Sequence, residues 1–475
     1  MLQETDQHSG LQHSLKQRHM TMIALGGVIG AGLFVGSGVV IQSAGPAAII
    51  SFLITGILVI LVMRMLGEMA VALPAVGSFY EYSRLAWGER LAWGELAGFL
   101  TGWMYWYFWV IVVAVETVAG AKLLQFWLPD VPSWILSLSL IAILTLTNLV
   151  SVRSFGEFEF WFASIKVAAI VVFLFLGSLF VLGLWPEASF SFANLTAHGG
   201  FAPHGIAPVL SGAVAATGFY FGAEIVTIAA AETAEPKRAV AQATNSVITR
   251  VLVFYIGSVF LVVSIIPWNS SGIATPYVSA LEALGIPAAA QIMNVVVLTA
   301  VLSALNSGLY ASSRMLFALT KRGDAPQGLA KLSRQGVPVR AILVGTVFGY
   351  ISVIMSYISP DTVFAFLVNS YGTVAIFVYV LIAISQLRLR ARLEREAPER
   401  LTVKMWGYPY LTYVAILGMI SIVVAMAFIP EQRTPLILGT VSLAVLLLAY
   451  VVRLYWGRKP SIAPVTMEAH QYSEL

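Results

Sequence analysis

The chain has 475 residues, of which 59% are hydrophobic and 11% are charged, with a formal net charge of +4. Soluble domains carry about 25% charged residues, so this composition excludes an ordinary soluble enzyme and indicates a polytopic membrane protein. Cysteine is absent, which excludes disulfides and thiolate metal sites.

Apolar stretches long enough to cross a bilayer recur along the whole chain. A transmembrane helix needs about 20 such residues. We expect twelve spans, at residues 20–44, 46–70, 98–127, 133–151, 159–184, 207–230, 248–268, 288–319, 338–358, 362–388, 409–429 and 434–456. The predicted fold is therefore an all-α integral membrane protein.

The distribution of cations predicts the orientation of these spans. If the N-terminus is cytoplasmic, the loops on the same side carry most lysines and arginines, whereas the opposite loops carry Arg433, with Lys122 near the outer end of the third span. Because cytoplasmic loops are enriched in lysine and arginine, this bias predicts that both termini are cytoplasmic.

The first span contains an unusual concentration of glycine. Residues 26–38 include six glycines, and each costs a helix about 1 kcal/mol relative to alanine. We interpret the run as a helix that stops near Ile29 and restarts near Leu33, because broken backbone inside a membrane is tolerated where it lines a cavity. The restarted half would present free N–H groups to a carboxylate. The alternative is close helix packing through the GxxxG pairs Gly26/Gly30 and Gly32/Gly36.

A second interruption is predicted in the sixth span, where Gly218 and Gly222 flank aromatic residues. Interrupted spans at corresponding positions of two halves are typical of inverted-repeat transporters, which bind their substrate near the bilayer midplane. The pairing of spans 1 and 6 therefore favours a transporter with discontinuous helices 1 and 6.

Three ionisable side chains at membrane depth are candidates for proton coupling. They are Glu116 in span 3, Lys166 in span 5 and Glu224 after the break in span 6. A buried charge in the bilayer is costly and marks function by default. The alternatives are an interhelical hydrogen bond for Glu116, snorkelling to the headgroups for Lys166 and capping of exposed N–H groups for Glu224.

Other polar and aromatic side chains in the spans have two interpretations. Tyr105 begins an aromatic run that either contributes to a substrate pocket or forms an interfacial belt. Asn306 in span 8 either lines a polar pathway or bonds a neighbouring helix. Structural roles near the inner surface are expected for Arg64, Glu68, Glu157 and Glu159, and an inner-gate ion pair or an anchoring role for Arg314.

Motifs of other functional classes are missing from the sequence. It contains no phosphate loop with its lysine, no HExxH zinc motif and no Gly-x-Ser-x-Gly elbow. We therefore expect no enzyme activity, no ATP dependence and no metal or other cofactor. A channel would require a selectivity filter or a ring of charge, and neither is recognisable.

Several motifs resemble one transporter family. Residues 27–36 (GVIGAGLFVG) are similar to the span 1 signature of the amino acid–polyamine–organocation superfamily, and residues 65–69 (MLGEM) with 74–79 (PAVGSF) resemble its bacterial amino acid permeases. Residues 224–232 (EIVTIAAAE) and 245–248 (NSVI) resemble the members that carry 4-aminobutyrate (GABA). The similarity extends from about residue 15 to about residue 456.

The resemblance implies a leucine-transporter-type five-plus-five inverted repeat with two additional C-terminal helices. It implies that the substrate carboxylate binds at Ile29, Gly30, Ala31 and Gly32, and that the ammonium group binds near Phe219, Tyr220, Phe221 and Gly222. It also places Lys166 where sodium-coupled relatives hold a cation, which favours the proton as coupling ion.

These observations predict six regions: a cytoplasmic N-terminal tail (1–17), a first five-helix repeat (18–184), a second (185–390), a charged cytoplasmic loop (391–408), helices 11 and 12 (409–456) and a cytoplasmic C-terminal tail (457–475). The predicted function is import of a small amino acid, foremost 4-aminobutyrate, by proton symport with alternating access across a bacterial inner membrane. The alternatives are an amino acid exchanger, a symporter for proline, an aromatic or another neutral amino acid and, less favoured, a channel or a nutrient sensor. The expected partners are the amino acid, the proton and the lipid bilayer, without nucleic acid.

Overall fold

The computed structural model describes residues 15–26, 29–30, 32–75, 77–88, 92–186, 188–233, 235–358 and 360–455. The predicted site residue Ala31, most of the predicted N-terminal tail and the whole C-terminal tail lie outside these ranges. Within them the chain is helical, and the β-structure consists of an isolated parallel bridge between Leu15 and Thr233.

The first half of the chain forms helices that are mostly long and apolar. They are α1 (Gln17–Gly26), a π-helix (Gly32–Gly36), α2 (Ser37–Ala44), α3 (Ala48–Ala72), α4 (Phe79–Trp87), α5 (Ala92–Leu124), α6 (Ser133–Val150) and α7 (Val152–Val181). Helix α4 lies between α3 and the membrane-length helix α5. It therefore belongs to the connection between two expected spans.

The second half contains more interruptions. Its helices are α8 (Ile206–Thr217), α9 (Ile225–Ala229), α10 (Pro236–Thr249), a π-helix (Arg250–Gly257), α11 (Ser258–Ile265), α12 (Pro276–Ala283), α13 (Ala289–Lys321), α14 (Val339–Ile358), α15 (Pro360–Glu396), α16 (Tyr410–Phe428) and α17 (Pro430–Tyr455). Short 3-10 turns lie at Gly45–Ala47, Ala193–Leu195, Gly218–Tyr220, Ala230–Glu232, Ser271–Ala274, Gln327–Ala330 and Pro398–Arg400.

The helices support a multi-pass membrane protein. Among the described residues, ten helical stretches are long and apolar enough to cross a bilayer, and Val339–Met355 is a shorter apolar helix. The first stretch, Gly32–Ala72, joins parts of two expected spans. The number of twelve spans therefore stays a prediction.

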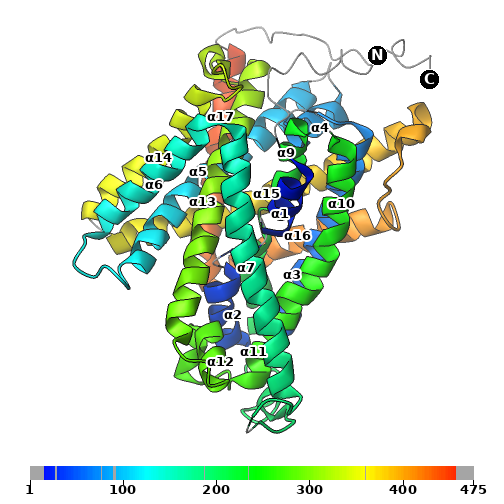
Figure 1. Ribbon diagram of the computed structural model, residues 1–475. Helices are drawn as coiled ribbons and strands as arrows, with labels where there is room; N and C mark the ends of the chain where they lie inside the picture. Colours follow the sequence, from blue (N-terminus) through cyan, green and yellow to red (C-terminus); the bar gives the residue numbers. More distant parts are fainter. Residues whose placement is uncertain are drawn as a thin grey trace.

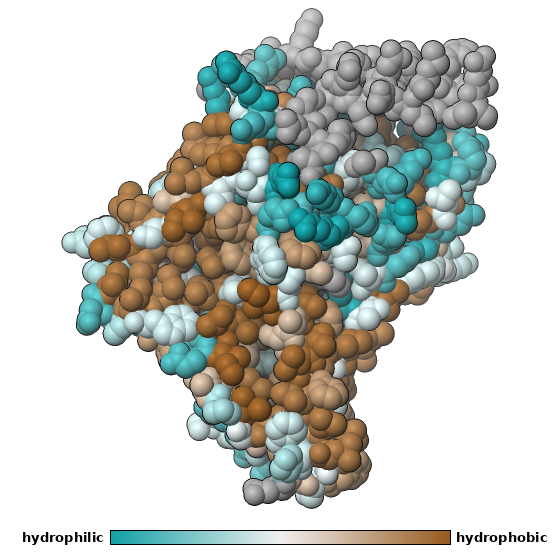
Figure 2. Space-filling view, viewed as in Figure 1, coloured by the Kyte–Doolittle hydropathy of each residue, from teal (hydrophilic) through white to brown (hydrophobic). Residues whose placement is uncertain are grey.

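The surface agrees with a lipid environment. Figure 2 shows hydrophobic side chains over the flank formed by α6 and α14 and over the middle of the molecule, with hydrophilic side chains gathered towards the upper end. Large apolar side chains are exposed along these helices, among them Ile143, Leu146, Val347, Ile351 and Ile354. In water such a continuous surface would be unfavourable, whereas lipid solvates it.

The interior of the bundle contains α13, which packs against both α5 and α7. Figure 1 shows α7 and α13 side by side, with α1 and α2 at different levels of the bundle. The whole of α13 from Leu305 to Thr320 is buried. This central position brings the polar side chains of α13 next to those of α7.

Candidate functional site

The helix of the first span is interrupted within the glycine run. It ends at Gly26 and resumes as a π-helix at Gly32, with Ile29 buried in the non-helical segment between them. Leu33 donates its N–H to the carbonyl of Gly30, which closes a turn before the helix restarts. Gly30 borders open space, since a Cβ added there would meet no described atom within 4 Å.

The sixth span is interrupted at the second predicted position. The turn Gly218–Tyr220 ends at Phe221, whose backbone is extended (φ −65°, ψ 146°), and Gly222 has a φ of +113°. This φ lies in a region that glycine adopts without the steric penalty of a side chain. Gly218 also borders open space.

The two interruptions lie against each other. A Cβ added to Gly32 would be 2.5 Å from the ring of Phe219, and one added to Gly36 would be 2.6 Å from it. The hydroxyl of Tyr255 donates to the carbonyl of Phe219 at 2.6 Å, and the hydroxyl of Tyr220 donates to the carbonyl of Phe52 at 2.9 Å. The aromatic turn, which consists of Phe219, Tyr220 and Phe221, is thereby held next to Gly32 and Gly36 of the first interruption.

Glu224 connects the second break to two other helices. Its Oε2 accepts the N–H of Gly222 at 3.1 Å and the hydroxyl of Tyr379 at 3.0 Å, while Oε1 accepts the hydroxyl of Tyr105 at 3.2 Å. Tyr105, Glu224 and Tyr379 are at most 2% exposed, and Gly222 is also buried. Phe221 stacks on Tyr379, with 4.2 Å between ring centroids. The structure thus brings Tyr105, Glu224 and the aromatic turn together.

Lys166 belongs to a buried polar cluster between α7 and α13. Its Nζ donates to the hydroxyl of Ser303 at 2.8 Å, and that hydroxyl donates to Oε1 of Glu159 at 2.6 Å. The three side chains are at most 1% exposed. Glu159 was expected to have a structural role near the inner surface, and its spacing of two helical turns from Lys166 was the available sequence signal for a shared face.

Asn306 and Glu116 border this cluster. Asn306 lies 3.5 Å from Oε2 of Glu159 and accepts a hydrogen bond of 2.9 Å from Asn148. Among the described residues, the side chain of Asn306 thus bonds with α6 and α7, not with the interrupted turns. Glu116 is close enough to Lys166 for a Coulombic attraction, but its Oε2 makes no hydrogen bond within the described part of the chain.

Arg314 forms an ion pair with Glu232, in agreement with one of its two expected roles. Its Nε and Nη2 bind both carboxylate oxygens of Glu232, at 2.7 and 3.3 Å, and Tyr310 donates to the same carboxylate at 2.9 Å. The backbone N–H of Leu15 donates to the carbonyl of Glu232 at 3.2 Å. The segment that precedes α1 is thereby joined to the end of the sixth span.

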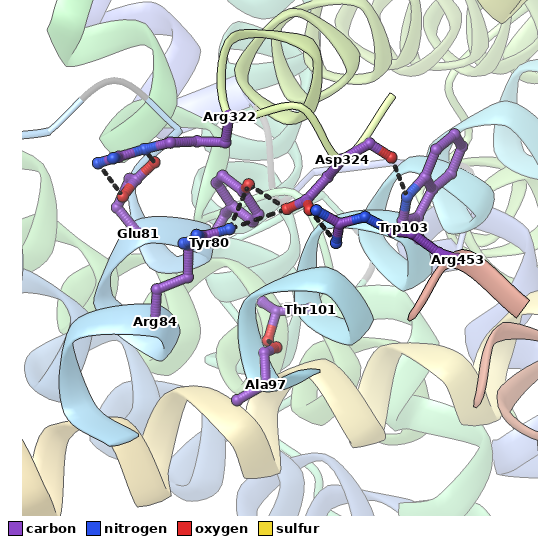
Figure 3. Close-up of polar contacts among 9 residues, drawn as sticks. All are labelled: Tyr80, Glu81, Arg84, Ala97, Thr101, Trp103, Arg322, Asp324 and Arg453. Carbon is purple, nitrogen blue, oxygen red and sulfur yellow. Dashed lines mark hydrogen bonds and ion pairs between the residues drawn. The ribbon is translucent and has the colours of Figure 1, made fainter. Parts of the chain in front are cut away.

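A second ionic network fixes α4 (Figure 3). Asp324, just beyond the end of α13, accepts the hydroxyl of Tyr80 at 2.5 Å and Nη1 of Arg84 at 3.0 Å, and it is ion-paired with Arg453 of α17. Arg322 binds Glu81 through two hydrogen bonds of 2.8 Å. Sequence reasoning did not predict this network.

The charges of this network keep the Arg84 side chain protonated. Burial by itself would lower the pKa of Arg84, but the neighbouring Tyr80 and Asp324 raise it above the usual value. Burial and the Asp324 carboxylate also raise the pKa of Tyr80 well above its ordinary range. The tyrosine therefore remains a neutral hydrogen-bond donor to Asp324 at physiological pH.

Arg250 is a buried cation that was not singled out in the sequence. It is 1% exposed, and its Nη2 donates to the carbonyl of Ala243 at 2.9 Å and lies 3.1 Å from the hydroxyl of Ser246. Its Nε and Nη1 have no hydrogen-bond partner among the residues that the structure describes. The described ranges also contain no cluster of three or more metal-ligating side chains.

Comparison with known proteins identifies the relatives of this chain. The amino acid permease family matches residues 19–459. The chain is 52% identical over 464 residues to the gamma-aminobutyric acid permease of Bacillus subtilis (strain 168), a match that covers 97% of this chain and 98% of the relative. It is 45% identical to the gamma-aminobutyric acid permease of Escherichia coli (strain K12), over 91% of this chain and 92% of the relative.

More distant relatives differ in what their names say they carry. The chain is 41% identical to an aromatic amino acid transport protein of Corynebacterium glutamicum, over 87% of this chain and 90% of that protein. Its fold is similar to that of a mutant of the manganese transporter from Eremococcus coleocola, with a TM-score of 0.57, 13% identity and 93% coverage of each chain. The structural likeness concerns the fold alone.

Proposed function

The chain belongs to the amino acid permease family, and from this premise we propose that it imports 4-aminobutyrate by proton symport with alternating access. The identity of 45–52% to permeases named for this substrate supports the choice of amino acid. The observation that carries the mechanism is the pair of facing interruptions, one at Gly26–Gly32 and one at Gly218–Gly222.

The interruptions offer complementary backbone groups to the two ends of a zwitterion. The restarted helix that begins at Gly32 has N–H groups without an intrahelical partner, and these attract a carboxylate. The turn of Phe219, Tyr220 and Phe221 offers carbonyl groups to the ammonium end. Ile29, Gly30, Ala31 and Gly222 complete the proposed substrate contacts, with Tyr105 joined to them through Glu224.

Proton coupling is proposed for Lys166, Glu116 and Glu224. Lys166 and Glu224 are fully buried in the centre of the bundle, where an ionised group is retained at a cost and marks a functional position. Import of a zwitterion with one proton moves one net charge. At about 100 mV this supplies about 2.3 kcal/mol, equivalent to about a fifty-fold gradient.

The proposed setting is the bacterial inner membrane, with both termini in the cytoplasm. The cation-rich loops support this orientation. In the proposed five-plus-five repeat, the interrupted helices 1 and 6 would move relative to α5, α7 and α13 and expose the site to each side in turn.

The test is uptake of labelled 4-aminobutyrate by the purified full chain in proteoliposomes. We expect accumulation driven by an inward proton gradient, abolished by a protonophore and reduced by unlabelled 4-aminobutyrate. Uptake that ignores the gradient and requires internal amino acid would establish an exchanger instead. Binding of 4-aminobutyrate without uptake would indicate a nutrient sensor.

Aromatic amino acids are the second candidate substrate class, because the chain is 41% identical to an aromatic amino acid transport protein. The same vesicles should therefore be challenged with phenylalanine, tyrosine, tryptophan and proline in excess. We expect weak competition by all four. Strong competition by the aromatic amino acids would assign the permease to that class.

A further inference from the structure

We propose that Glu159 receives the proton of Lys166 through the hydroxyl of Ser303 and releases it towards the cytoplasmic end of α7. The inference rests on the proposed proton symport, since it names the path by which the coupling proton leaves the lysine. Glu159 was expected to be a structural residue near the inner surface, whereas it lies inside a continuous hydrogen-bonded chain.

The three groups are connected in the order that a proton relay requires. Lys166 Nζ donates to Ser303 Oγ at 2.8 Å, and Ser303 Oγ donates to Glu159 Oε1 at 2.6 Å. The second distance is typical of a charge-assisted O–H···O⁻ bond. Both donors therefore point in the same direction, from the lysine to the carboxylate.

The transfer balances with groups of this chain alone. As the ammonium N–H of Lys166 breaks, its proton forms a new O–H bond on Ser303, and the original hydroxyl proton of Ser303 forms an O–H bond on Glu159. The ion pair becomes a neutral amine and a neutral carboxylic acid, and the serine carries no lasting charge. Neutralisation of both groups is favoured by their burial, since an apolar environment disfavours the ionised forms.

The geometry differs from that of a purely structural ion pair. A direct salt bridge would place Nζ and a carboxylate oxygen within 4 Å, and no such contact joins Lys166 to Glu159 in the described parts of α7. The hydroxyl of Ser303 lies between the two side chains. Asn306 lies 3.5 Å from the other oxygen of Glu159 and is itself bound to Asn148, which positions the carboxylate towards Ser303.

The direction of release follows from the helix. Glu159 precedes Lys166 by seven residues, about 10 Å along α7, and lies nearer to its beginning at Val152. In the proposed orientation this end is cytoplasmic. Glu116 approaches Lys166 with an oxygen that has no hydrogen-bond partner among the described residues, so Glu116 in its protonated form is the group placed to return a proton to the neutral lysine after the transfer.

The experiment compares two assays on the full chain in proteoliposomes. The first is counterflow of labelled 4-aminobutyrate at equal pH, which reports binding and movement of the site. The second is accumulation driven by a pH gradient, with proton entry followed by an internal dye. Ser303→Ala removes the relay hydroxyl and leaves both charges, whereas Ser303→Thr keeps a hydroxyl. The matched control is Ser312→Ala on the same helix, because among the described residues the Ser312 hydroxyl bonds only the carbonyl of Leu309 in its own helix.

We expect Ser303→Ala to retain counterflow and to lose about 100-fold in the rate of pH-driven uptake, the lower end for removal of a positioned proton-transfer group. Ser303→Thr should restore the coupled rate, and Ser312→Ala should leave both assays unchanged. Glu159→Gln, which keeps the side-chain size and an acceptor oxygen, should reproduce Ser303→Ala. A melting curve of each variant verifies that it is folded.

Two results would overturn the relay. One is normal pH-driven accumulation by folded Ser303→Ala or Glu159→Gln, and the other is an equal loss in both assays that threonine does not rescue. Lys166→Met separates this failure from that of the proposed function. If Lys166→Met accumulates substrate normally, proton coupling through the lysine is wrong. If it is uncoupled while Ser303→Ala is normal, the relay alone is wrong.

Discussion

Phe219 packs so closely against Gly32 that a Cβ at position 32 would lie 2.5 Å from its ring. This contact joins the two interrupted helices at the point where the first one restarts. A ring cannot retreat easily from this position, because the carbonyl of its own residue is held by the hydroxyl of Tyr255 at 2.6 Å.

We expect Gly32→Ala to reduce stability by about 1–3 kcal/mol, the usual cost of overpacking, and to abolish uptake. Gly30→Ala should leave the melting temperature unchanged but lower the affinity, because its methyl group would enter open space next to the proposed carboxylate position. Gly372→Ala on α15 is the matched control, since a Cβ there also meets no described atom within 4 Å. Equal melting temperatures for Gly32→Ala and Gly372→Ala would contradict the packing argument.

The hydrogen bonds of Glu224 predict a graded effect on transport. Tyr105→Phe and Tyr379→Phe each remove one donor to the carboxylate, and each should weaken substrate affinity or stability by about 1 kcal/mol. Glu224→Gln should impair uptake more strongly than either. Tyr357→Phe, at a tyrosine that is 71% exposed on α14, serves as the control. The measurements are the KM of uptake and the melting temperature, and a normal KM for Glu224→Gln would exclude the carboxylate from the mechanism.

Lys166 and Glu116 should separate binding from coupling. We expect Lys166→Met to bind 4-aminobutyrate, as measured by calorimetry, and to lose accumulation driven by a proton gradient, because the side chain can no longer release a proton. Glu116→Gln should strongly impair uptake. Lys122→Met, at the end of α5, is the control for loss of a lysine. Unchanged uptake by Glu116→Gln would reduce this carboxylate to a packing role.

Asp324 should contribute to stability through its two arginines. Asp324→Asn leaves Arg84 and Arg453 without their carboxylate, and we expect a loss of about 3 kcal/mol, the low end for breaking a buried ion pair, because both arginines retain some exposure. Arg238→Gln is the control, since its pair with Glu235 is exposed and should change stability by less than about 0.5 kcal/mol. Thermal unfolding in detergent gives both values, and equal shifts would show that Asp324 has no special role.

Arg250 should illustrate a conflict between stability and function. Because its Nε and Nη1 are buried without a partner in the described chain, Arg250→Met should keep or raise the melting temperature. Transport should nevertheless fall, since a buried cation with two N–H groups that lack a partner among the described residues is retained in a membrane helix for function by default. A variant that melts earlier and transports normally would instead assign Arg250 to helix packing through Ala243 and Ser246.

The sequence by itself determined the membrane class, the approximate positions of the helices and the two places where a helix is interrupted. These are local properties: hydrophobic length is counted along the chain, and Gly222 adopts its φ of +113° because of its own missing side chain. The motifs around residues 27–36 and 224–232 also sufficed to indicate the amino acid permease family, which the match over residues 19–459 confirmed.

Only the tertiary structure decided which side chains meet. Ser303 and Glu159 are 144 residues apart in the chain, and Asp324 and Arg453 belong to α13's end and α17. Their contacts depend on how each helix is rotated and packed in the bundle, which hydrophobic patterning hardly specifies when a span is apolar on all sides. For the same reason the sequence did not reveal that Glu159 is linked to Lys166 through Ser303, a contact that the packing of α7 on α13 creates.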